Sequence, residues 1–189
     1  CLQDLASSLT DRGLSLQWRR GEPVEEVVRA AREWKVDAVY WNRDYEPRAI
    51  ERDRTVAQRL AQAGVVVRTF KDHVVFEADE VRGVTGEPLQ RYSAYRARWW
   101  TKWHATTPAV QPVPTTLAEK VAAPLPVSCH LPTAPELGYD PVALRIEPGE
   151  RNALNRLRWF VEGPIHSYAT TRNLPANDGC SQLSPHFRF

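Results

Sequence analysis

Apolar residues recur through the first 70 positions with the spacings of helices and strands in alternation. A helical spacing over 2–12 ends at Gly13, and a period of two over 14–18 predicts a strand. Further helices are predicted over 23–34, which begins at a proline, and over 47–63, which ends before Gly64. Short apolar runs at 38–41 and 65–67 predict strands. Strands that alternate with helices of this length predict an α/β fold with a parallel, Rossmann-like sheet.

Residues 92–103 predict a helix with an aromatic face. Four aromatic side chains share that face: Tyr92, Tyr95, Trp99 and Trp103. Three basic residues lie between them: Arg96, Arg98 and Lys102. A nucleic-acid surface is one interpretation, and a helix that packs its aromatic face on a sheet with its charges in water is the favoured one.

Proline then changes the character of the chain. Nine of its fifteen prolines fall within 104–149, and such a density forbids helix and disfavours sheet. A new helix begins at Pro148-Gly149-Glu150, with Leu154, Leu157 and Val161 on its apolar face. We therefore expect an α/β domain over 1–103 that lacks its first strands, a proline-rich linker over 104–148, and the beginning of an all-helical domain over 149–189.

Composition narrows the class of protein. The chain is 42% hydrophobic with a net charge of +2, so any binding of nucleic acid must depend on local charge. No apolar run is long enough to span a membrane. Three widely spaced cysteines predict a reduced, cytoplasmic setting and no metal site. Because methionine is absent and the chain opens within a helical pattern, we expect a fragment truncated at both ends.

The segment near the C-terminus has the chemistry of an anion site. Gly179 permits a tight turn, and Ser181 and Ser184 are small hydroxyl residues suited to the start of a helix. The free N–H groups of such a helix start can hold a phosphate. A capped helix start without a ligand is the alternative.

The spacing around this segment resembles that of the DNA photolyase/cryptochrome family. Tyr168, Arg172 and Pro175 precede Gly179 as in the family, where a Gly-Thr-Ser-Arg-Leu-Ser-Pro sequence follows. This chain departs from the family pattern at Cys180 and Gln182. Weaker blocks of similarity lie over 40–56, 86–99 and 148–160, and the match is best to class I enzymes that act on cyclobutane pyrimidine dimers.

The resemblance implies a light-driven, FAD-dependent lyase that repairs UV-damaged DNA. It also implies a monomer that does not associate with a membrane. The residues that it places at FAD are Tyr168, Cys180, Ser181, Gln182, Leu183 and Ser184, and it places Arg172 near DNA. Asn42 and Arg43 match positions near an antenna pigment, which is a methenyltetrahydrofolate or a deazaflavin in the family. No catalytic residue of the family falls in this chain, so we expect the fragment alone to be inactive.

Two other functions stay open at this point. One is a cryptochrome, a blue-light receptor without DNA-repair activity, because cryptochromes share every block of sequence similarity found here. A nucleotide-binding α/β module without light chemistry would also explain the anion site.

Overall fold

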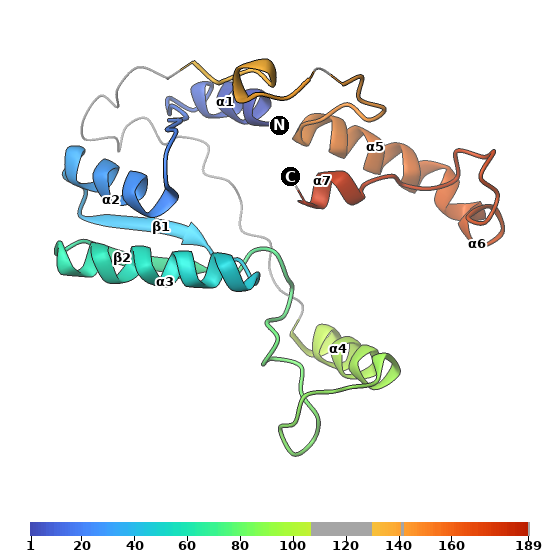
Figure 1. Cartoon of the computed structure of the whole chain (residues 1–189). Helices are drawn as coiled ribbons and strands as arrows, with labels where there is room; N and C mark the ends of the chain where they lie inside the picture. Colours follow the sequence, from blue (N-terminus) through green and yellow to red (C-terminus); the bar gives the residue numbers. More distant parts are fainter. Residues whose placement is uncertain (107–129, 141, 189) are drawn as a thin grey trace. The chain divides into compact units, whose positions relative to one another are not determined.

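A computed structural model describes residues 1–106, 130–140 and 142–188 of the chain. It divides into two compact units (Figure 1). The contiguous unit is Arg19–Pro112, and the discontinuous unit combines Cys1–Trp18 with Val113–Phe189. Most of the predicted proline-rich linker lies outside the described residues.

The contiguous unit is built on a parallel β-α-β motif. Strand β1 (Ala38–Asn42) pairs in parallel with β2 (Val66–Phe70), with Ala38 opposite Val66 and Asn42 opposite Phe70. Helix α2 (Pro23–Glu33) precedes β1, and α3 (Pro47–Gln62) connects the two strands. The predicted α/β class and parallel pairing are therefore confirmed.

Local signals explain where these helices begin and end. Pro23 and Pro47 each stand in a first helical turn, where no backbone N–H is needed. The Glu22 side chain accepts a hydrogen bond from the Glu25 N–H and so caps α2. Gly64 follows α3 with a φ of 75°, a left-handed conformation that glycine adopts without strain. The polypeptide can therefore turn directly from α3 into β2.

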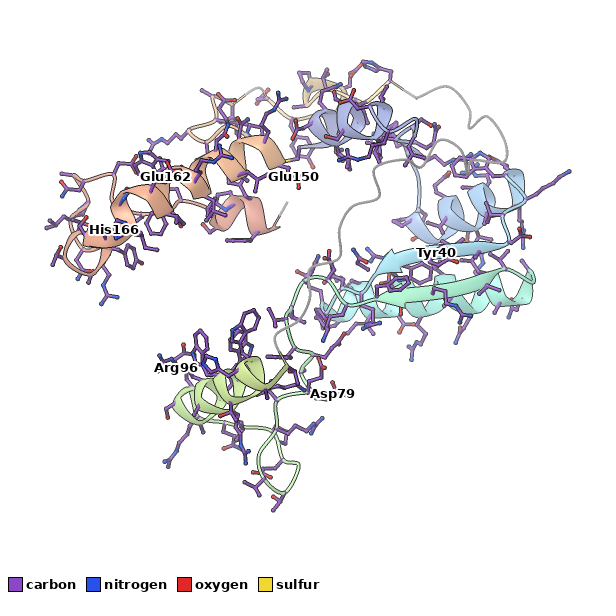
Figure 2. The ribbon with its side chains drawn as sticks, turned by 180° about the vertical axis from the view of Figure 1, so that it is seen from behind. Tyr40, Asp79, Arg96, Glu150, Glu162 and His166 are labelled. Carbon is purple, nitrogen blue, oxygen red and sulfur yellow. The ribbon has the colours of Figure 1, made fainter. Side chains whose placement is uncertain are left out.

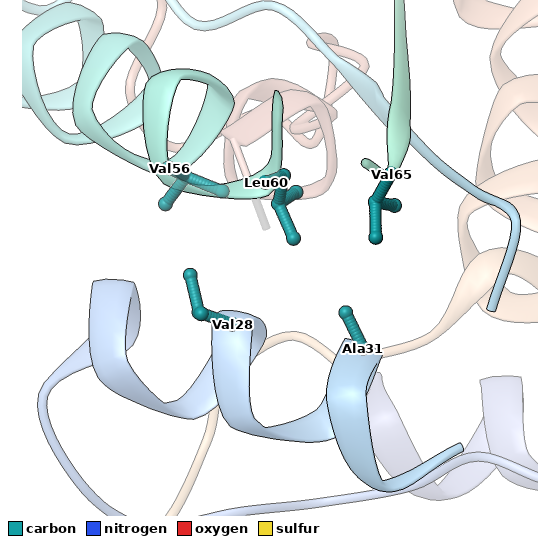
Figure 3. Packing of buried hydrophobic residues seen from close by; sticks show 5 residues of the cluster. All are labelled: Val28, Ala31, Val56, Leu60 and Val65. Carbon is teal, nitrogen blue, oxygen red and sulfur yellow. The ribbon is translucent and has the colours of Figure 1, made fainter. Parts of the chain in front are cut away.

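The core of this unit lies between α2 and α3 (Figure 3). Val28 and Ala31 of α2 face Val56 and Leu60 of α3, and Val65 completes the cluster. Leu60 is fully buried. Val39, Trp41 and Val67 pack against the cluster from the sheet.

The opposite face of the sheet carries aromatic side chains. The rings of Tyr40 (labelled in Figure 2) and Phe70 stack across the strand pair with centroids 6.1 Å apart, and Tyr40 is 64% exposed. The period-two alternation of β1 thus separates a core side from an aromatic side.

Helix α4 (Tyr92–Thr106) forms where the sequence predicts it, but its partner is not the sheet. The Trp99 ring packs edge-on against Phe76, with centroids 5.4 Å apart, and stacks on Trp103 at 5.5 Å. Phe76 belongs to the segment after β2 and is buried. The expected packing of this aromatic face on a sheet is therefore wrong, because the chain between β2 and α4 supplies its own apolar side chain.

The discontinuous unit is helical. It contains α1 (Leu2–Thr10), the 3₁₀ turn η2 (Pro135–Leu137), α5 (Glu150–Glu162), η3 (Pro164–Ser167), α6 (Tyr168–Thr171) and α7 (Ser184–Arg188). Asp4 of α1 accepts a hydrogen bond from the Glu150 N–H at 2.9 Å, so the first helix supplies the cap of α5. The predicted domain boundaries at residues 103 and 149 stay predictions.

One detail of the sequence prediction is wrong, and one predicted apolar face is exposed. Residues 14–18 form no strand, and the sheet within the described ranges pairs β1 with β2 alone. The expected apolar face of α5 is exposed at Leu154, Leu157 and Val161. The more protected side carries Ala153, Arg156 and Phe160 instead.

Candidate functional site

Helix α5 supports the segment that the sequence marks as an anion site. Figure 2 shows Glu150 and Glu162 at the two ends of α5, with His166 beyond it. After α6, the chain turns and reaches α7 at Ser184. We call residues 178–184 the 178–184 turn.

Gly179 lies buried under α6. A Cβ atom at this position would lie 2.7 Å from the Thr171 hydroxyl oxygen and 3.1 Å from its Cβ. Thr171 is itself fixed, because its hydroxyl donates to the Ser167 carbonyl at 3.0 Å. The close approach of the turn to α6 therefore requires a glycine.

Arg156 of α5 holds the 178–184 turn with four hydrogen bonds. Its two Nη atoms donate to the Asp178 carboxylate at 3.0 and 2.6 Å, a bidentate pair. Nη2 also donates to the Cys180 carbonyl at 2.9 Å, and Nε donates to the Ser181 carbonyl at 3.0 Å. The guanidinium lies over the Trp159 ring, 3.8 Å from its centroid. One side chain thus holds three residues of the turn: Asp178, Cys180 and Ser181.

Gln182 completes this network. Its φ of 53° is left-handed, which is uncommon for a residue other than glycine. Its side-chain amide donates to Asp178 at 2.8 Å. The Arg156 hydrogen bonds and charge lower the pKa of Asp178, and the Gln182 hydrogen bond lowers it further. The carboxylate is therefore ionised at neutral pH.

The structure brings five of the predicted FAD residues together in this turn. Leu183 is buried and anchors it, and the Cys180 side chain is half-buried. In the described part of the chain, the hydroxyls of Ser181 and Ser184 make no hydrogen bond, and neither do the backbone N–H groups of residues 180–184. The turn therefore presents a row of unused donors.

The other two predicted residues of this unit lie at the two ends of α6. Tyr168 begins the helix and packs edge-on against Phe160, with centroids 5.8 Å apart. Arg172 ends the helix and is exposed. Their separation of four residues places them one helical turn apart.

A cavity of about 330 Å³ borders the turn. Its lining includes Arg145, Arg156, Trp159, Gln182 and His186. The cavity is mixed in character, with three basic or potentially basic groups beside an indole ring, and it is open on one side.

The two predicted antenna residues lie at the carboxyl end of β1, and their polar groups are engaged. The Asn42 amide donates to Asp72 at 3.0 Å. Arg43 donates to Glu77 through Nη2 at 2.5 Å and Nε at 3.2 Å, and to the Thr69 carbonyl at 3.1 Å. These contacts fasten the segment after β2 to the edge of the sheet.

The pKa values of Glu77 and of the neighbouring Tyr45 are both shifted, for different reasons. The hydrogen bond from Arg43 lowers the pKa of Glu77, while burial raises the pKa of the adjacent Tyr45 hydroxyl. A cavity of about 380 Å³ lies nearby, lined in part by Trp41, Asn42, Arg52 and Asp53. The pigment assignment of Asn42 and Arg43 stays a prediction.

The described ranges contain neither a cluster of metal-ligating side chains nor a helix suited to span a membrane. No three His, Cys, Asp or Glu side chains there are grouped to hold a metal ion. No helix in that part of the chain is long and apolar enough to cross a bilayer.

Sequence reasoning missed Arg156 and Asp178. The sequence did contain an indication for Arg156. It lies three residues after Ala153 and four before Phe160, a spacing that puts all three on one side of α5, the side that the turn covers. Asp178 stands four residues before Gln182, but nothing local in the sequence joins it to α5.

Comparison with known proteins agrees with this architecture. The family model described as DNA photolyase matches residues 1–115. A deoxyribodipyrimidine photo-lyase from a Synechococcus species is 35% identical over the whole chain, and cryptochrome-1 from Arabidopsis thaliana is 26% identical. The chain spans 40% of the first protein's length and 28% of the second's.

A solved structure extends the similarity to three dimensions. The class III photolyase from Agrobacterium tumefaciens superposes with a TM-score of 0.74 at 28% identity, over 98% of this chain and 39% of that one. The matched sequence blocks, the parallel β-α-β motif and this superposition lead to one conclusion: the chain belongs to the DNA photolyase/cryptochrome family.

Proposed function

We propose that this chain is part of a light-driven, FAD-dependent enzyme that splits cyclobutane pyrimidine dimers in DNA. The observation that carries the proposal is the 178–184 turn, with its unused N–H and hydroxyl donors at the start of α7. The greater identity to a photo-lyase than to a cryptochrome supports repair over signalling.

The residues of the turn suit the pyrophosphate of FAD. Backbone N–H groups and small hydroxyls are the usual phosphate donors at a helix start. Ser181 and Ser184 supply the hydroxyls, and Leu183, 7% exposed, keeps the backbone in place from below. Gln182 turns its side chain toward Asp178, so its contribution to FAD is a backbone N–H rather than a side-chain contact.

When bound and reduced, FAD supplies the electron that light transfers to the dimer. The protein's part is to bind the cofactor and to orient it toward a base taken out of the helix. Tyr168 borders the cofactor from α6 in this proposal, and the exposed Arg172 contacts a DNA phosphate. Residues 149–189 then form the beginning of the FAD-binding helical domain, after the α/β domain and the linker.

Light-dependent repair is the direct test. The protein from the complete reading frame, with its flavin reduced, is incubated with dimer-containing DNA under blue light and in the dark. We expect dimers to disappear only in the light. Bound, reduced FAD without light-dependent loss of dimers would reject repair and favour the cryptochrome function.

Arg172→Ala tests the DNA contact separately. Loss of one phosphate contact should weaken DNA binding and reduce the slope of log K against log salt by about 1, with FAD content unchanged. Arg158→Ala is the matched control, since Arg158 is an exposed arginine of the same unit whose only hydrogen bond among the described residues is a 3.4 Å contact with Asn155. Equal effects of the two variants would place Arg172 away from DNA.

A further inference from the structure

We propose that Arg156 is a positioning residue, which turns the backbone N–H groups of the 178–184 turn toward the FAD pyrophosphate without contacting FAD itself. This inference rests on the proposed flavin site. It assigns a role to a side chain of α5 that lies 22 residues before the start of the turn in the sequence.

The argument begins with the planarity of the peptide group. In a trans peptide, the C=O of one residue and the N–H of the next point in opposite directions. Arg156 holds the carbonyls of Cys180 and Ser181 at 2.9 and 3.0 Å. The N–H groups of Ser181 and Gln182 must therefore point away from the guanidinium, to the side where no described residue accepts from them.

The conformation of Gln182 points the same way. Successive N–H groups form a concave anion site where a right-handed helical residue is followed by a left-handed one, or in a turn, and Gln182 supplies the left-handed residue. Gln182 has a φ of 53°, and its side chain is held by Asp178, the same carboxylate that Arg156 binds. The network thus fixes both the direction of the carbonyls and the left-handed residue.

This arrangement also explains how the chain tolerates its two departures from the family sequence. If backbone N–H groups hold the pyrophosphate, the side chains at Cys180 and Gln182 need not contact FAD. The geometry of the turn is then the essential property. It depends on a fork-shaped, permanently charged donor, which lysine cannot replace because it is a single point charge.

The experiment compares three variants of the protein from the complete reading frame: Arg156→Gln, Arg156→Lys and, as a matched control, Arg158→Gln. Arg158 lies two residues further along α5, and its one hydrogen bond among the described residues is to Asn155, outside the turn. Three quantities are measured: the FAD dissociation constant, hydrogen exchange of the amides of 179–184, and the midpoint of thermal unfolding.

We expect Arg156→Gln to raise the FAD dissociation constant at least tenfold and to speed exchange in 179–184. Arg156→Lys should lose affinity to an intermediate extent, and Arg158→Gln should match the wild type within twofold. If Arg156→Gln does not fold, the Lys variant, which keeps the charge and most of the volume, decides in its place.

Other outcomes would overturn the inference. If Arg156→Gln lowers the thermal midpoint but leaves FAD affinity unchanged, Arg156 stabilises the fold and does not position the turn for FAD. An equal loss of affinity in the Arg158 control would show a general effect of charge. Absence of FAD binding in the wild type would instead reject the proposed function, and the exchange rates would still show whether Arg156 orders the turn.

Discussion

Replacement of Gly179 by alanine tests the geometry of the 178–184 turn with one methyl group. The added Cβ would lie 2.7 Å from the Thr171 hydroxyl oxygen, well inside van der Waals contact. Thr171 can escape only by rotating about χ1, which breaks its hydrogen bond to the Ser167 carbonyl. Loss of that bond costs about 1 kcal/mol.

A second contact adds to the cost. The Thr171 Cβ, 3.1 Å from the new methyl carbon, cannot rotate away, so α6 and the turn must separate by a few tenths of an ångström. Overpacking of this kind costs about 1–3 kcal/mol. We therefore expect Gly179→Ala to destabilise the protein by about 2 kcal/mol and to weaken FAD binding.

The assay is a double-mutant cycle with Thr171→Ala, read by urea unfolding and by FAD affinity. Thr171→Ala removes the oxygen at 2.7 Å and leaves the carbon at 3.1 Å, so the double mutant should recover about half of the loss. Contacting residues usually couple by about 0.5–3 kcal/mol. The reasoning fails if Gly179→Ala unfolds with the wild type, or if the two changes are additive.

Two further predictions concern the contiguous unit. Leu60→Ala should lower the free energy of unfolding by about 2–5 kcal/mol, because Leu60 is fully buried between α2 and α3. The control is Ile50→Ala on the same helix, which should change the free energy of unfolding by less than about 1 kcal/mol because Ile50 is 53% exposed. Similar urea midpoints for the two variants would contradict this packing. The Glu77 carboxylate, whose pKa Arg43 lowers below its ordinary 4.5, should stabilise this unit above that pH and lose its contribution as the pH falls through the lower, folded-state pKa. The Glu77→Gln variant should therefore lose less stability than the wild type as the pH falls into the acid range, and an unchanged pH profile would mean that the ion pair does not form in solution.

The elements of the contiguous unit were predictable because their signals are local. Pro23, Pro47 and Gly64 mark helix ends, and the apolar spacing between them places the core of α2 and α3. Strand 14–18 failed for the opposite reason. An alternating pattern indicates that a segment is able to form a β-strand, but the strand forms only if another strand elsewhere in the chain pairs with it.

The candidate site divides in the same way. The turn and the helix start were predictable, because the local spacing of Gly179, Ser181 and Ser184 is enough to indicate both. The contacts that hold the turn in place were not predictable, because Arg156 and Asp178 are 22 residues apart and meet only in the tertiary structure. The aromatic face of α4 shows the same limit, since the sequence gives the stripe but not Phe76 as its partner.

The cap that Asp4 provides for α5 has a consequence for the order of folding during synthesis. Asp4 and Glu150 are 146 residues apart, and the whole contiguous unit lies between them. Closing a loop of that length costs roughly 2 kcal/mol more than closing a ten-residue loop, unless the intervening chain is already compact. Residues 19–106 can collapse on their own as they leave the ribosome, which shortens the distance that remains. Helix α1 must then wait for the start of α5, so the contact between Asp4 and Glu150 forms only after residues 19–106 have been made.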